Sequence, residues 1–295
     1  MNRTAPGPVV KNVASLFLLL SGLAVAGASC SEDGDVITDD GGAGGGLRCD
    51  DLPDDCEGRA AAQGVAAIQA VHTRTDAVAA ELALQCQALS VALGGAASEV
   101  APTGDPLTDA EAWCAVAQGR VATLDATIQM SSAACVFVVG SLAACEAACV
   151  GVATCESQLE ARCPSGAVVD GGCSDRPLSP PAPCNSCPAC TASCAIESNA
   201  SATCAPGAVT VELAVDDPPK EEALRAPLAR VLAAMTVTEI LAEEMLDVAA
   251  AVTAGSQDAR VQHCQSDTVP LIEVAAARLE RVMAVNASLV AALAG

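Results

Sequence analysis

The chain has 295 residues and carries 36 acidic side chains against 14 basic ones, so its formal net charge at pH 7 is −22. An excess of negative charge this large repels phosphate groups, which excludes binding to nucleic acids or to anionic lipid headgroups. The chain has no tyrosine, one tryptophan and two phenylalanines, so it has almost no aromatic faces on which sugars or bases could stack.

The first 29 residues have the features of a signal peptide. Arg3 and Lys11 make the start positive, and the apolar run over residues 13–26 is too short to span a bilayer comfortably. The sequence GASC, which ends at Cys30, resembles the lipobox of bacterial lipoprotein precursors. Ala26 and Ala28 also offer an A-x-A site to ordinary signal peptidase, whose product would be secreted or periplasmic.

The segment 30–48 favours the lipoprotein interpretation. It is rich in Gly and Asp, cannot bury apolar surface, and would form a flexible tether after a lipidated Cys30. The chain has 17 cysteines, and a lipid on Cys30 leaves an even number that can pair completely. By resemblance to lipoprotein sorting signals, Ser31 favours the outer membrane of a two-membrane bacterium. We therefore expect a lipid to anchor a folded domain at the membrane.

A long helical hairpin is predicted over residues 49–130. Apolar residues recur at steps of three and four over residues 57–93, and a Gly-Gly pair then ends this first helix. The second helix is expected to begin at Thr108, in a capping box with Glu111. Its apolar stripe continues to Ile128, so helix is expected almost to the end of the hairpin segment.

Each of these two predicted helices carries one cysteine on its apolar stripe. Cys86 lies about two turns before the end of the first helix, and Cys114 lies about two turns into the second. An antiparallel hairpin would bring the two side chains level, within reach of a disulfide. We therefore predict a Cys86–Cys114 bridge.

The segment 131–215 holds eleven cysteines and is rich in proline. Two short apolar or alternating runs, over residues 134–139 and 209–215, predict strands of a small antiparallel sheet. Two Cys-x3-Cys units, each followed by a further cysteine and an apolar run, suggest an internal duplication. The cysteines singled out as disulfide candidates in the whole chain are Cys86, Cys114, Cys145, Cys149, Cys163, Cys184, Cys187, Cys190, Cys194, Cys204 and Cys264.

Residues 216–295 are predicted to form a pair of helices packed on the same domain. Pro227 is expected to kink or restart the first of them. Cys264 lies between the two helices. Because the cysteines of the hairpin segment are even in number, Cys264 is expected to bond to the cysteine-rich segment. Asn286 falls on an apolar stripe and is expected near a fraying surface end; a role in fixing register is the alternative.

The stretch CNSCPACTASC, residues 184–194, has the cysteine spacing by which bacterial ferredoxins hold an iron–sulfur cluster. Ala195 stands where the ferredoxin pattern has proline, and the signal segment lacks the twin arginine of proteins exported in a folded state. A zinc half-site and a redox motif are further interpretations. A disulfide framework is the interpretation we favour, because the chain is exported and its small apolar side chains form a thin core.

No catalytic motif is present in the sequence. His72 and His263 are the only histidines, and His72 falls on an apolar stripe, where a hydrogen-bonded structural role is expected. A hydrolase would require a cleft that joins one of these histidines to a carboxylate. No catalytic residue, cofactor-binding residue or metal ligand is therefore predicted.

Five segments resemble an uncharacterised family of exported, alanine- and cysteine-rich bacterial proteins. The segments are LQCQALSVALGG, AWCAVAQGRVATLD, CVFVVGSLAACEAAC, CAPGAVTVELAV and the region around VQHC. The resemblance covers most of residues 80–295. It implies a helical, disulfide-rich architecture and no activity, because none is established for the family.

The expected fold is α+β and mostly α. It consists of the long N-terminal helical hairpin, a central disulfide-rich segment with a small antiparallel sheet, and the C-terminal helix pair. The expected function is that of a non-enzymatic cell-envelope lipoprotein, bound to the membrane through its lipid and serving a structural or protein-binding role toward an envelope or surface protein. A metal-binding or redox module centred on Cys184, Cys187, Cys190 and Cys194 is the alternative.

Overall fold

The computed structural model describes residues 49, 51–138, 142–150, 168–169, 172–174, 187–252 and 255–294. The elements below belong to one compact unit, Leu47–Gly295. The predicted signal peptide and tether, with Cys30, lie outside the described residues. Within the described residues the protein is mostly helical, with short antiparallel strands, which confirms the predicted fold class.

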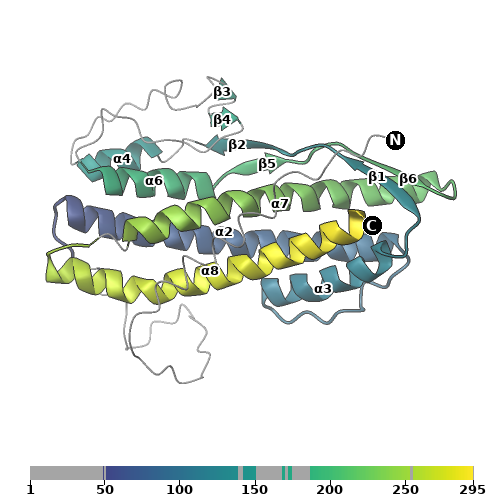
Figure 1. The fold of residues 1–295 in the computed structure, drawn as a ribbon, viewed down its shortest axis with the longest axis horizontal. Helices are drawn as coiled ribbons and strands as arrows, with labels where there is room; N and C mark the ends of the chain where they lie inside the picture. The colour runs from purple at the N-terminus through teal and green to yellow at the C-terminus, as the bar shows by residue number, and fades with distance from the viewer. Residues whose placement is uncertain are drawn as a thin grey trace. The chain divides into compact units, whose positions relative to one another are not determined.

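Three long helices form the body of this unit. They are α2 (Cys56–Ala92), α7 (Pro218–Val252) and α8 (Ala259–Ala294), and each packs against the other two (Figure 1). Ile68 on α2 and Leu279 on α8 are among their fully buried side chains. Burial of each such side chain stabilises the fold by roughly 1.5–3 kcal/mol. No helix among the described residues is long and apolar enough to cross a membrane.

The predicted helical hairpin is formed by α2 and α3 (Pro106–Val121), which also packs against α8. Gly94, with a φ of 88°, turns the chain after α2 in the left-handed conformation that glycine adopts most readily. The structure contains the predicted disulfide between Cys86 and Cys114, with an S–S distance of 2.00 Å and a Cα–Cα distance of 4.8 Å. Both cysteines are buried between the two helices.

The predicted start of the second helix at Thr108 is wrong by two residues. The helix begins at Pro106, and Asp105 caps it by accepting hydrogen bonds from the backbone N–H of Thr108 at 2.9 Å and from its hydroxyl at 2.7 Å. Arg278 of α8 donates to the same carboxylate at 2.8 Å. Burial alone would raise the pKa of Asp105, but the hydrogen bonds from Arg278 and Thr108 outweigh it and hold this pKa well below its usual range.

Replacing Asp105 by alanine is expected to lower the free energy of unfolding by about 1–2 kcal/mol, because α3 loses its cap. Urea unfolding followed by circular dichroism measures the change. Asp216→Ala removes an exposed carboxylate from the turn before α7 and should change stability by less than about 0.5 kcal/mol. Equal effects of the two substitutions would contradict the capping role.

The helical prediction for the end of the hairpin segment is also wrong. α3 ends at Val121, and Ala126–Met130 form strand β1, which pairs antiparallel with β6 (Val209–Leu213). Ile128 therefore lies opposite Val211 in a sheet, and not on a helix. The β-branched Thr127 and Ile128 suit a strand whose partner is distant in sequence.

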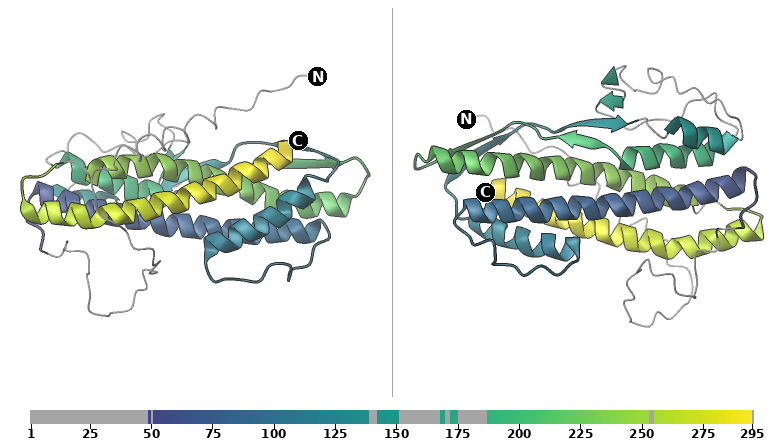
Figure 2. Two further views of the ribbon diagram at one scale, coloured as in Figure 1. Left: turned by 60° about the horizontal axis from the view of Figure 1, so that its bottom comes forward. Right: turned by 180° about the vertical axis from the view of Figure 1, so that it is seen from behind.

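A second sheet has the strand order β3-β4-β2-β5, and its neighbouring strands are antiparallel. The bounds of its strands are Ala134–Val138 for β2, Val168–Val169 for β3, Gly172–Ser174 for β4 and Thr203–Ala205 for β5. The strands predicted over residues 134–139 and 209–215 are thus present as β2 and β6, but each pairs with other strands. β5 and β6 contact α7, and the strands run along the side of α7 that faces away from α8 (Figure 2).

The two C-terminal helices are present with two differences from expectation. α7 is one continuous helix that does not restart at Pro227. Asn286 on α8 is not at the surface; it is 4% exposed and donates a hydrogen bond to the hydroxyl of Thr238 on α7 at 3.1 Å. Buried between two long helices, this polar pair favours the register-fixing alternative.

Candidate functional site

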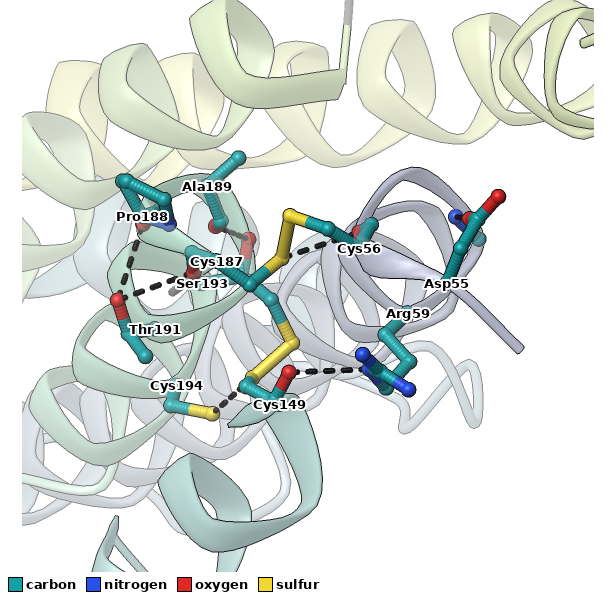
Figure 3. The surroundings of a disulfide bond; sticks show 12 residues. Asp55, Cys56, Arg59, Cys149, Cys187, Pro188, Ala189, Thr191, Ser193 and Cys194 are labelled. Atoms are coloured by element: carbon teal, nitrogen blue, oxygen red, sulfur yellow. Dashed lines mark hydrogen bonds between the residues drawn. A yellow bond between two sulfur atoms is a disulfide. The ribbon is translucent and has the colours of Figure 1, made fainter. Parts of the chain in front are cut away.

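A group of bonded cysteines joins α6 (Pro188–Ala200) to α4 (Leu142–Val150) and to the start of α2 (Figure 3). We call this group the cysteine cluster. Its disulfides are Cys56–Cys187, Cys145–Cys194 and Cys149–Cys190. The side chains of Phe137 and Leu142 pack in the same apolar core, so the bridges are part of the interior of this end of the molecule.

The cysteine cluster contains two disulfides that lie side by side. Cys145 and Cys149 are one helical turn apart on α4, and Cys190 and Cys194 are one turn apart on α6, so each pair faces the same way. The first cysteine of each helix bonds to the second of the other. The sulfur atoms of Cys149 and Cys194, which belong to different bridges, are 3.5 Å apart.

The local sequence explains this arrangement. Alanines next to the cysteines on both helices let the backbones approach to Cα–Cα distances of 5.8 and 5.6 Å at the two bridges. Pro188 occupies the first turn of α6, where its missing N–H costs nothing, and Cys187 is the residue before the helix. The two Cys-x3-Cys units identified in the sequence are therefore partners of each other.

Hydrogen bonds of polar side chains connect the cysteine cluster to α2. The Arg59 side chain donates from Nε to the carbonyl of Cys149 at 2.9 Å (Figure 3). It also donates from Nη1 to the carboxylate of Asp54 at 2.9 Å. Asp55 accepts a hydrogen bond from the backbone N–H of Gly58 and caps α2. The end of α4 is thereby held to the start of α2 directly by a charged side chain, whereas the disulfides connect the two helices only through α6.

The structure separates the cysteines of the CNSCPACTASC motif. Cys187, Cys190 and Cys194 each bond to a different partner outside the motif, and Cys184 lies outside the described residues. Cys163 also lies outside them. The described cysteines of this motif, Cys187, Cys190 and Cys194, thus lie along about the first two turns of a disulfide-bonded helix.

The prediction for Cys264 is wrong. It bonds to Cys49 with an S–S distance of 2.06 Å, and not to the cysteine-rich segment. The bond from Cys56 to Cys187 likewise crosses between the two groups that were expected to pair internally. Cys264 lies within α8, next to Val261 and close to Ala61 of α2, so packing of the helix ends brings it to residue 49.

Cys204 on β5 bonds to Cys135, which lies directly opposite it on β2.

Neither histidine lines the pocket between β2 and α7. That pocket, of about 210 Å³, lies between β2 and α7 and is lined by Phe137, Ile240, Glu239 and Glu243 among others. His72 is partly exposed on α2, with Nδ1 3.8 Å from a carboxylate oxygen of Asp76, and His263 is exposed beside Cys264.

The buried carboxylic acid of Glu244 was not predicted from the sequence. Glu244 on α7 is 4% exposed and accepts a hydrogen bond from the side chain of Asn199 on α6 at 2.9 Å. Burial raises the pKa of Glu244 to about 8; the Asn199 bond opposes this, and Asp247 and Glu243 add to it. The available signal was the position of Glu244 within the apolar stripe of α7, one turn after residue 240.

The comparisons with known proteins give no match: no protein-family model, no curated protein and no solved structure is similar to this chain.

Proposed function

We propose that this protein is a non-enzymatic cell-envelope lipoprotein whose disulfide-bonded domain serves a structural or protein-binding role. The observation that carries the proposal is the set of six disulfides among the described residues. Disulfides persist in oxidising compartments and are rare in the cytosol. The domain therefore belongs to an oxidising environment outside the cytoplasm.

The pattern of the bridges supports a structural role. Cys49–Cys264 and Cys56–Cys187 join residues that are 215 and 131 positions apart, so α2 is tied at its start to both α8 and α6. Closing loops of this length restricts the unfolded chain strongly. A domain held in this way keeps its shape with a core made mainly of small side chains.

The N-terminal sequence supports the anchor. The GASC sequence at Cys30 and the Gly/Asp-rich residues that follow are those of a lipid-bearing cysteine on a flexible tether. The full chain has a formal charge of −22, and an acidic excess of this size repels other anionic surfaces and attracts basic partners. The proposed location is the outer membrane, with Ser31 as the sorting residue.

Replacing Cys30 by serine is expected to abolish incorporation of labelled fatty acid and to move the protein from the membrane fraction to the soluble fraction. Globomycin should make the wild-type precursor accumulate. Ser29→Ala keeps a small residue before the cysteine and should leave both lipidation and fractionation unchanged. Wild-type protein that carries no labelled lipid would overturn the anchor.

A further inference from the structure

We propose that Cys145, Cys149, Cys190 and Cys194 have a second, reduced state in which their four thiolates bind one zinc ion. This state lies beyond the proposed envelope function, which needs only the oxidised bridges. The two can therefore fail independently: a protein without a lipid could still bind zinc when reduced, and a lipoprotein could fail to do so.

Three of the four sulfur atoms already lie close enough together for a tetrahedral site. Those of Cys145, Cys149 and Cys194 all lie within 4.8 Å of one another, and Cys190 is bonded to Cys149. Zinc–sulfur bonds of about 2.3 Å in a tetrahedron place neighbouring sulfurs about 3.8 Å apart. The sulfurs of Cys149 and Cys194 are already 3.5 Å apart. After reduction, the sulfurs within each former bridge must separate by about 2 Å, and the sulfur of Cys190, which lies outside the close group of three, must also move toward it; rotation of the side chains can supply both movements.

The surroundings suit a negatively charged metal–thiolate centre. Four thiolates around Zn²⁺ carry a net charge of −2. Arg59 lies against the cluster, with Nε 2.9 Å from the carbonyl oxygen of Cys149. Cys190 stands in the first turn of α6, where the positive end of the helix dipole favours a thiolate over a thiol. A cationic side chain and a helix start therefore both stabilise the charge that the four sulfurs would bear.

The exposure of the sulfurs gives the order of reduction. Cys145 is partly exposed, whereas Cys149, Cys190 and Cys194 are 1–2% exposed. An external dithiol attacks the sulfur of Cys145 and displaces Cys194 as a thiolate; its second thiol then releases Cys145. The Cys194 thiolate, 3.5 Å from the sulfur of Cys149, attacks it and displaces Cys190. A second dithiol reduces the resulting Cys149–Cys194 bond.

Electrons and protons balance in this reduction. Two dithiol molecules become two disulfides and supply four electrons and four protons, which convert two S–S bonds into four thiols. Zinc binding then releases the thiol protons to solvent, because the ligands are thiolates. Within the described residues, no other group of three or more cysteine, histidine or acidic side chains has ligand atoms as close together.

Cobalt(II) titration of the full chain, reduced by a phosphine that does not bind the metal strongly, tests the site. We expect one equivalent of Co²⁺ to give the red-region absorption of tetrahedral cobalt thiolate, and Zn²⁺ to displace it. C145S/C194S should abolish the band, whereas C86S/C114S, which removes a distant bridge, should retain it. Absence of the band in the wild type, or its equal loss in both variants, would overturn the proposal.

A second measurement uses only the wild-type chain and so does not depend on the folding of a variant. The reduced protein is treated with an alkylating reagent with and without one equivalent of Zn²⁺, and each cysteine is assigned by mass spectrometry. Zinc should slow alkylation of Cys145, Cys149, Cys190 and Cys194 at least about tenfold and leave Cys86 and Cys114 unaffected. Protection of other cysteines in place of these four would contradict the assignment.

Discussion

Replacing Cys86 and Cys114 together by alanine is expected to lower the free energy of unfolding by about 3–4 kcal/mol. The bridge closes a loop between residues 28 positions apart, and no other cysteine lies inside that loop. Other bridges therefore do not shorten it, and the chain-entropy relation for a loop of this length gives about 3.6 kcal/mol. The two helices should still form, because their apolar stripes remain intact.

Guanidinium unfolding followed by circular dichroism measures this loss. Val91→Ala, at a 45% exposed position on the same helix, is the control and should change stability by less than about 0.5 kcal/mol. A loss below about 1 kcal/mol in the cysteine variant would mean that the α2–α3 hairpin keeps its structure in the unfolded chain, so that the bridge removes little entropy.

The Cys86–Cys114 bridge could be predicted because its two partners lie on regular helices that follow each other along the chain. Helical periodicity places each cysteine on a face and at a height, and an antiparallel hairpin then determines which sulfurs meet. Cys49 and Cys264 offer no such constraint. They are 215 positions apart, and their proximity follows from the packing of α2 against α8, which counting cysteines cannot reveal.

Strand β1 was not predicted because it, too, depends on a partner that is distant in sequence. Residues 126–130 have apolar positions that also fit the end of a helical stripe, and only the distant β6 makes the extended form favourable. The cysteine cluster was recognised as a disulfide framework, but its pairing was not. Two Cys-x3-Cys helices can bond in parallel or antiparallel order, and the choice depends on how α4 and α6 pack.

Replacing Glu244 by glutamine is expected to stabilise the protein at pH 9 and to leave it nearly unchanged at pH 4.5. Burial raises the pKa of Glu244 from 4.5 to about 8, so the folded protein holds a proton that the unfolded chain releases in this range. The free energy of unfolding of the wild type therefore falls as the pH rises from the unfolded-state pKa toward the folded-state pKa of Glu244, by at most about 4–5 kcal/mol. Glutamine does not titrate and keeps an acceptor for Asn199.

Urea unfolding at pH 4.5, 7 and 9 measures this difference, which should grow with pH to the order of a few kcal/mol. Glu273→Gln, an exposed substitution on α8, is the control for the loss of one acidic group and should follow the wild type. Asp105 and Glu111, whose pKa values are lowered, lose their stabilising effect only below this range, as the pH falls. The burial-raised pKa of Glu239 affects the wild type and the glutamine variant alike. Parallel curves for Glu244→Gln and the wild type would mean that Glu244 ionises in the folded protein as easily as in the unfolded chain.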